Sequence, residues 1–311
     1  MKLVTFAVSS GEVRIGAALP EENAIVDFSV GNPAPYFRDM LAFIDGGDEA
    51  LDHAHALIGM RSYLHPEDQV TLHAPVPEPR QMRDFLVFEA HLRQARANRH
   101  LVGISGQTSD PAKIEIPDVW YDQPIYYKCN RFSVIGTERD IIWPRYAGIL
   151  DYELEFGAFI GRSGKNISRE AAPSHIFGYC IFNDVSARDT QMREMLGQLG
   201  PAKGKDFDTG NVLGPWLVTK DEIPDPRALT MVARINGEEW SRGTSHDMRH
   251  GFEDMIVHVS TDEQLRAGEF FGSGTVGGGC GLEIGRFLSP GDVVELEVSG
   301  LGLLRNRIVR P

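Results

Sequence analysis

The pattern of apolar and polar residues predicts a chain rich in short β-strands. Near the start, alternation indicates strands over Lys2–Ala7, Arg14–Ala18 and Ala24–Asp27, followed by helices over Tyr36–Ile44 and Ala50–Leu57. The proline-rich stretch that begins at Ala74 is typical of an extended linker. We therefore predict a small N-terminal α/β domain over residues 1–74 and a larger domain over residues 75–311.

In the larger domain, many strand-like runs are separated by only short helical patterns. The spacing of Phe85, Phe88 and Leu92 is helical, and Thr261 with Gln264 resembles a capping box that would start another helix. The pattern lacks the regular strand–helix alternation of a doubly wound parallel sheet. The fold class predicted is therefore α+β and β-rich, with mixed sheets around a core.

Two predicted strands carry carboxylates. Alternation over 150–156 places Glu153 and Glu155 on one face, roughly 6–7 Å apart along the strand. A second apolar run, starting at Phe177, ends at Asp184. Buried carboxylates need a positive partner, and an oxygen-only set suits Mg²⁺, Mn²⁺ or Ca²⁺ better than Zn²⁺. A solvated strand face with two exposed glutamates is the alternative.

Composition narrows the class of protein. The chain has 311 residues and a formal net charge of −13, which argues against nucleic acid as a partner. No apolar run reaches the length of a membrane span, and Met1 leads directly into a strand pattern rather than a signal peptide. Three widely spaced cysteines fit a reducing compartment, so we expect a cytoplasmic protein that binds no membrane.

Four motifs in order resemble the fumarylacetoacetate hydrolase family. They are D-Y-E-L-E from Asp151, N-D-V-S-A-R-D-T-Q from Asn183, K-D-F-D-T from Lys205 and G-T-V-G-G from Gly274. The resemblance covers the chain from about residue 80 to its end. It implies a mixed β-roll catalytic domain that usually dimerises, and hence a homodimer.

The resemblance also implies roles for residues. His91 would activate water, and Asp84, seven residues earlier, would join Glu153, Glu155 and Asp184 as a metal ligand. Many shorter members carry a Glu three residues after this His, but here Gln94 stands there, so Glu89 or a distant glutamate must be its partner. Further roles follow for Lys205 and Gln191 at the oxyanion, for Thr209 in support of the metal, and for Thr275, Arg188 and Lys128 in binding the substrate.

Several of these positions also have structural interpretations. Arg188 could form an internal ion pair instead of binding a carboxylate, and Lys128 could simply solvate a strand end. The polar stretch 100–120 could be a lid or an ordinary surface loop. His246 and His250 have helical metal-pair spacing but no third ligand, so a structural role is favoured.

The function predicted is an Mg²⁺- or Mn²⁺-dependent hydrolase that cleaves the C–C bond of a 1,3-diketo acid of the fumarylacetoacetate, fumarylpyruvate or acylpyruvate type. Such an enzyme would act in catabolism of aromatic compounds or amino acids. The same metal and enolate would also serve a decarboxylase, an isomerase or a sugar-acid dehydratase. A non-catalytic Ca²⁺-binding protein is the alternative from a different class.

Overall fold

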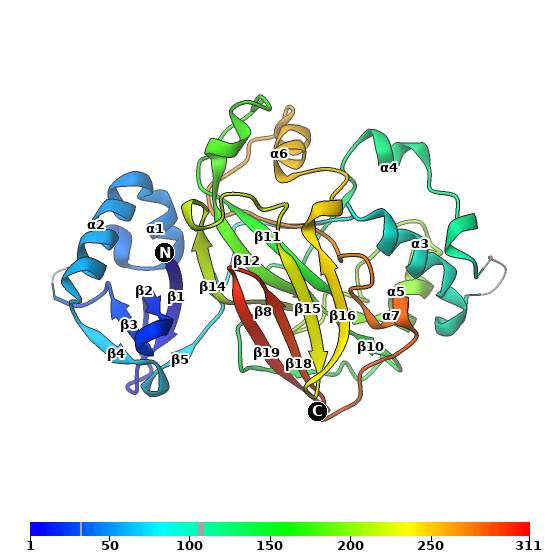
Figure 1. The fold of residues 1–311 in the computed structure, drawn as a ribbon, viewed down its shortest axis with the longest axis horizontal. Helices are drawn as coiled ribbons and strands as arrows, with labels where there is room; N and C mark the ends of the chain where they lie inside the picture. Colours follow the sequence, from blue (N-terminus) through cyan, green and yellow to red (C-terminus); the bar gives the residue numbers. More distant parts are fainter. Residues whose placement is uncertain (32, 105–108) are drawn as a thin grey trace.

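The computed structural model describes residues 1–31, 33–104 and 109–311, and its described part is dominated by two mixed sheets (Figure 1). The large sheet runs in the order β4-β3-β2-β1-β14-β12-β11-β17-β6-β7, with β5 paired to β1 and β8 paired to β14. Its strands are β1 Lys2–Ala7, β2 Val13–Leu19, β3 Ala24–Asp27, β4 Leu64–Pro66, β5 Thr71–Leu72, β6 Met82–Phe85, β7 Tyr126–Lys128, β8 Val134–Ile135, β11 Leu154–Ile160, β12 Ile176–Asp184, β14 Asn211–Thr219 and β17 Phe270–Gly272.

The second sheet runs in the order β16-β15-β18-β19-β9 and packs against the centre of the first. Phe156 and Tyr179 of the large sheet share one buried cluster with Met231 and Leu296 of the smaller sheet. This core between two mixed sheets confirms the β-rich α+β prediction. The remaining strands are β9 Asp140–Ile142, β15 Thr230–Ile235, β16 Glu238–Thr244, β18 Val293–Val298 and β19 Gly302–Val309, with β10 Leu150–Asp151 and β13 Ser186–Ala187 forming a separate pair.

Strands β11 and β12 lie at the centre of the large sheet, and every residue of both is buried. A strand covered on both faces reads as a continuous apolar run, which explains why the two sequences are so hydrophobic. Gly157 is required in β11, because a Cβ there would lie 2.2 Å from a ring carbon of Phe270. The start of β11 and the end of β12 lie beside the site described below.

The N-terminal segment, blue in Figure 1, continues the large sheet. Strand β1 pairs with β14 through Lys2 and Leu3. Phe28 and Phe43 also share a buried cluster with Phe177 of β12. Main-chain pairing and a common core therefore join this segment to the rest, and the division into domains 1–74 and 75–311 stays a prediction.

Helices lie around the sheets and at their edges. Helix α1 begins after Asp39, whose side chain caps it by accepting a bond from the Ala42 N–H at 2.7 Å, so the helix predicted from Tyr36 is interrupted there. Among the described residues, no helix is long and apolar enough to cross a membrane. The three cysteines are buried and free. The helices are α1 Met40–Asp45, α2 Gly47–Met60, α3 Glu89–Ala97, α4 Asp118–Asp122, α5 Arg188–Met195, α6 Phe252–Ser260 and α7 Gly281–Ile284.

Two helix predictions are wrong. Phe85 belongs to strand β6, which is held between β17 and β7, and helix α3 begins only at Glu89. Thr261 ends helix α6 instead of starting a new helix, because its hydroxyl donates back to the Val257 carbonyl at 2.9 Å. Asp262 then adopts a left-handed conformation at φ 56°, which a continuing right-handed helix does not allow.

Candidate active site

Three buried carboxylates meet on one face of the large sheet. Asp84 lies on β6, Glu155 on β11 and Asp184 at the end of β12. Each offers one oxygen to a group whose members all lie within 4.8 Å of one another. The strand pattern predicted Glu155 and Asp184, the family resemblance implied Asp84, and the structure brings all three together.

Strand register explains why they share a face. Glu155 is opposite Phe182, and Asp184 follows Phe182 by two residues. Asp84 is opposite Gly272, which in turn pairs with the second residue after Glu155. Because side chains alternate along a strand, all three carboxylates point the same way. Gly272 leaves the room that Asp84 needs, since a Cβ there would lie 2.5 Å from its Oδ1 atom.

The electrostatics of this group favour a bound cation. Burial and the nearby carboxylates raise the pKa values of Asp84 and Glu155 well above their ordinary range. Burial also raises the pKa of Asp184 to about 6, despite its contact with Lys205. The Oδ1 atom of Asp184 is buried and accepts no hydrogen bond from any described residue. An oxygen-binding divalent ion would supply the missing partner, so the residues fit Mg²⁺ or Mn²⁺.

Glu153 lies in the same cavity but is held by two cations. Lys205 Nζ contacts Glu153 Oε2 at 2.5 Å and Asp184 Oδ2 at 2.6 Å, and Arg188 Nη2 contacts Glu153 Oε1 at 2.7 Å. Although burial opposes its ionisation, Arg188 and Lys205 hold the pKa of Glu153 below its ordinary range. Arg188 also donates to Asp151 at 2.8 Å. The close group therefore contains three of the four predicted ligands, and the ligand role of Glu153 stays a prediction.

His91 has a glutamate partner that is far away in sequence. Its Nδ1 atom lies 2.8 Å from Glu283 Oε1, and both side chains are buried. Two backbone N–H groups of the glycine-rich loop also donate to the Glu283 carboxylate. Glu89 instead bonds Arg93 on its own helix. Glu283 is therefore the distant glutamate partner of His91 that the sequence left open. It could not be identified from the sequence because 192 residues separate it from His91.

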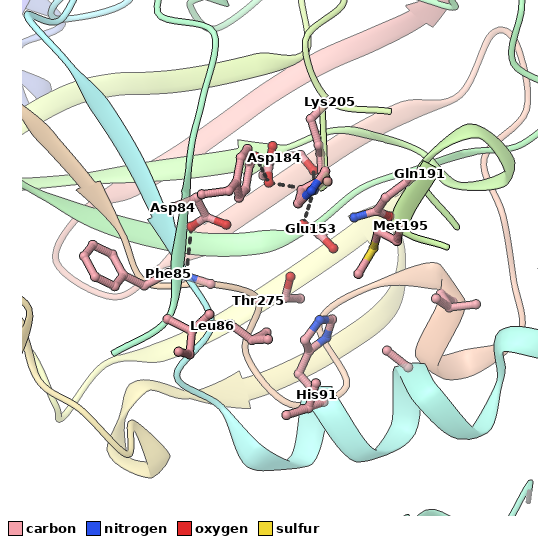
Figure 2. Close-up of a pocket in the computed structure, with 18 of the residues that line it drawn as sticks. Asp84, Phe85, Leu86, His91, Glu153, Asp184, Gln191, Met195, Lys205 and Thr275 are labelled. Carbon is pink, nitrogen blue, oxygen red and sulfur yellow. Dashed lines mark hydrogen bonds and ion pairs between the residues drawn. The ribbon is translucent and has the colours of Figure 1, made fainter. Parts of the chain in front are cut away.

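The carboxylates and His91 line one cavity of about 230 Å³. Figure 2 shows the His91 ring pointing from α3 towards the space below Glu153 and Asp184. Because Nδ1 faces Glu283, Nε2 is the nitrogen available to a bound molecule. Gln191 and Thr275 line the same cavity, as predicted.

Contacts of the predicted substrate-binding residues are largely internal. Gln191 Oε1 accepts from Arg188 Nη1 at 2.9 Å, and Thr275 Oγ1 donates to Glu155 Oε1 at 3.2 Å. Arg188 thus forms the internal ion pairs that were its structural alternative. Its role in binding substrate stays a prediction.

Two predicted positions lie outside the cavity. Lys128 is exposed and opposite Arg83, on the other face of β7 from the site, so its neighbour Tyr127 enters the cavity instead. Tyr127 donates to Asp184 Oδ2 at 2.7 Å. Strand alternation could have indicated Tyr127, but the family resemblance implied Lys128 instead. Thr209 accepts from the Ile142 N–H at 2.9 Å, so its hydroxyl fixes a surface turn rather than the carboxylates.

The predicted lid contains short helical turns beside α3. They are η4 Arg99–Val102, η5 Pro111–Lys113 and α4, while residues 105–108 of this stretch lie outside the described part. Trp120 donates to the Leu86 carbonyl at 2.6 Å, and Arg93 donates to the Ile114 carbonyl at 2.5 Å. These bonds tie the described parts to the cavity wall, and closure over a substrate stays a prediction.

Comparison with known proteins defines the class first by fold. The chain superimposes with a TM-score of 0.77 on a fumarylacetoacetate hydrolase of Exiguobacterium antarcticum, at 27% identity and covering 100% of both chains. It superimposes with a TM-score of 0.75 on a maleylpyruvate hydrolase of Sphingobium at 20% identity, covering 100% of both, which shows the fold alone. The observed sheets are thus those of a known hydrolase-type fold.

The family model for the fumarylacetoacetate hydrolase C-terminal domain matches residues 82–309, and the chain belongs to this family. Among its relatives is the mitochondrial oxaloacetate tautomerase fahd2 of Xenopus laevis, 31% identical over 99% of this chain and 90% of that protein. Another is the oxaloacetate tautomerase YisK of Bacillus subtilis, 30% identical over 86% of each. The family is enzymatic, but these relatives do not support C–C hydrolysis specifically, and the cytoplasmic location stays a prediction.

Proposed function

We propose that this protein is a metal-dependent tautomerase that interconverts the keto and enol forms of a 2-oxo acid, with oxaloacetate as the reference substrate. The observation that carries this proposal is the placement of the His91–Glu283 pair and the three-carboxylate group in one cavity. Enolisation needs a base beside the carbon next to a carbonyl and a positive centre at the carbonyl oxygen. The relatives named oxaloacetate tautomerases add support from sequence.

The Asp84, Glu155 and Asp184 carboxylates would hold Mg²⁺ or Mn²⁺, with Tyr127 orienting Asp184 by its hydrogen bond. When bound, this ion would supply a Lewis acid that lowers the energy of the enolate. Thr275 and the glycine loop fix Glu155 and Asp84 through the Thr275 hydroxyl and the Gly274 N–H. The carboxylate face is therefore rigid before substrate arrives.

His91 is the residue proposed to transfer the proton. Its neutral Nε2 atom would take the proton from the carbon next to the 2-oxo group, and Glu283 would stabilise the resulting imidazolium through Nδ1. The imidazolium would then return this proton to the enolate oxygen, which gives the enol and regenerates His91, and the reverse sequence gives the keto acid. Lys205 lies close to Asp184 and Glu153 and offers positive charge to the substrate oxygens.

Hydrolysis of a C–C bond is the second candidate, and the same His91–Glu283 pair favours it. A buried histidine held by a carboxylate is also the arrangement that activates water. The two reactions differ in whether His91 takes a proton from carbon or from water. They are distinguished by products rather than by the geometry of the site.

The decisive assay follows the absorbance of the enol of oxaloacetate as it decays, with and without Mn²⁺. Wild type is expected to accelerate the decay only with the ion, while His91→Ala and Glu155→Gln do not. An acylpyruvate is tested in parallel. Cleavage of the acylpyruvate without acceleration of enol decay would replace the tautomerase by the hydrolase, and inactivity on both would reject both.

A further inference from the structure

A second group of metal-binding atoms lies beside the active-site cavity. His91, Cys280 and Glu283 are buried and each offers one such atom, and the three atoms all lie within 4.8 Å of one another. His91 Nδ1 is 2.8 Å from Glu283 Oε1, and Cys280 Sγ is 3.5 Å from the same oxygen. The tautomerase chemistry proposed above uses His91 and Glu283 but not this thiol.

The backbone holds the three side chains together. Cys280 comes directly before α7 and Glu283 lies within this short helix, where its N–H donates to the Cys280 carbonyl at 3.2 Å. Asn98, at the end of α3, donates its side-chain amide to the carbonyls of Leu282 and Glu283 at 3.0 and 2.9 Å. Helix α7 is thereby attached to the helix that carries His91, so the fold itself brings the three atoms together.

The donor atoms of this group differ from those of the three-carboxylate group. Thiolate sulfur and imidazole nitrogen are ligands that suit Zn²⁺, whereas Mg²⁺ and Mn²⁺ prefer oxygen atoms. Bonds of roughly 2.0–2.3 Å place the ligand atoms of a tetrahedral zinc site about 3–4 Å apart. The distances of 2.8 Å and 3.5 Å within the group are close to this spacing. Three protein ligands and one water also match the coordination of an open zinc site.

The group can be reached from the cavity. His91 lines the cavity wall, and the adjoining glycine loop is only partly buried at Gly277 and Gly278. The Gly278 N–H donates to Glu283 Oε2 at 2.8 Å and fixes that end of the carboxylate. The other oxygen, Oε1, is the one that faces both His91 and Cys280.

We infer that His91, Cys280 and Glu283 form an inhibitory site for a thiophilic divalent ion, with Zn²⁺ as the reference ion. Binding of the ion is a property of these three side chains, while the inhibition rests on the proposed function of His91 as the base.

The protons and charges of this binding step balance. Burial raises the pKa of the Cys280 thiol, so the sulfur keeps its proton until a metal displaces it to solvent. The ion takes Nδ1 of His91, and the imidazole proton moves to Nε2. The thiolate and the Glu283 carboxylate then match the two positive charges of the ion. Because Nε2 is now protonated, His91 cannot take a proton from the substrate.

Cd²⁺ is the probe for binding, because a bond between Cd²⁺ and a thiolate gives an ultraviolet charge-transfer band that carboxylate ligands do not give. Mg²⁺-saturated protein, prepared without chelating thiols, is titrated with Cd²⁺. Wild type is expected to develop the band and to saturate at one ion per chain. Cys280→Ser should lose the band, since a hydroxyl is a poor ligand for a soft ion. Cys180→Ser is the matched control, because Cys180 is equally buried but its thiol faces the Ile181 and Gly214 carbonyls.

The inhibition is measured with Zn²⁺ in the assay of enol-oxaloacetate decay, at a fixed excess of Mg²⁺. Each protein is compared with its own rate without Zn²⁺. The Zn²⁺ concentration for half inhibition is expected to rise on the order of tenfold or more in Cys280→Ser. It should stay at the wild-type value in Cys180→Ser.

The outcomes separate the site from the proposed function. Absence of the band in wild type, or a band that survives Cys280→Ser in a folded protein, would overturn the site. Equal inhibition of wild type and Cys280→Ser would overturn its inhibitory role, since Zn²⁺ would then act by displacing Mg²⁺. A band that depends on Cys280, in a protein that does not accelerate enol decay even without Zn²⁺, would support the site and reject the proposed function.

Discussion

Replacing Glu283 by Gln changes which atoms of the active site carry protons without altering the shape of the site. The Glu283 carboxylate faces four donors: His91 Nδ1 at 2.8 Å, the Gly278 N–H at 2.8 Å, the Gly279 N–H at 3.0 Å and the Cys280 thiol at 3.5 Å. A glutamine has only one acceptor oxygen. If this oxygen keeps the backbone bonds, the amide N–H₂ group faces Nδ1, which must then act as an acceptor.

That rearrangement places the imidazole proton on Nε2, where the proposed base must be free. The expected loss is therefore the share of general base catalysis, roughly 10²–10⁴-fold in kcat. Loss of the charge-assisted bonds should also lower the free energy of unfolding by about 1–3 kcal/mol. Mn²⁺ affinity should be unchanged, since Glu283 is not in the three-carboxylate group.

Stopped-flow decay of enol-oxaloacetate measures kcat, and electron paramagnetic resonance measures Mn²⁺ affinity on the same samples. Glu89→Gln is the control, because Glu89 lies on the same helix as His91 and its carboxylate bonds Arg93 alone among the described residues. It should retain wild-type turnover. A folded Glu283→Gln protein with turnover within about threefold of wild type would refute the role of His91 as the base oriented by Glu283.

Three further predictions concern the metal site. Tyr127→Phe should weaken Mn²⁺ binding roughly tenfold, because Asp184 loses its orienting bond; unchanged affinity in the same titration would exclude that role. Metal affinity should fall as the pH drops through about 6, since the raised pKa values of Asp184, Asp84 and Glu155 mean that the ion must displace protons from them; an affinity that stays constant in titrations at several pH values would contradict this. Gly274→Ala should lower the free energy of unfolding by roughly 1–3 kcal/mol, because the φ of Gly274 is +79° and a Cβ would lie 2.2 Å from the Phe85 carbonyl oxygen. Thermal melts measure this effect, and an unchanged melting temperature would contradict it.

The sequence predicted those parts of the site that depend on local periodicity. Alternation and the strand end identified Glu155 and Asp184, and the family motif added Asp84 and His91. Glu155, Asp184 and His91 lie on strands and a helix that have a local pattern, whereas the strand that carries Asp84 was not recognised from its own sequence. The Asn236-Gly237 turn that joins β15 to β16 likewise depends on a local signal, since Asn-Gly favours a two-residue hairpin turn.

Features that depend on tertiary pairing were not predictable in this way. Glu283 reaches His91 because Asp151 anchors α7 through the Gly281 and Leu282 N–H groups, a contact that spans 130 residues or more. The helix prediction fails at Phe85 because the pairing of β6 with β17 overrides the helical spacing of its local sequence.

The account depends above all on the claim that Asp84, Glu155 and Asp184 form a single metal site. The most direct test is a titration of the purified protein with Mn²⁺, followed by electron paramagnetic resonance, for wild type and Glu155→Gln. We predict saturation at one ion per chain in wild type and loss of that binding in the variant. Equal binding by both proteins, or no binding by wild type, would contradict the claim.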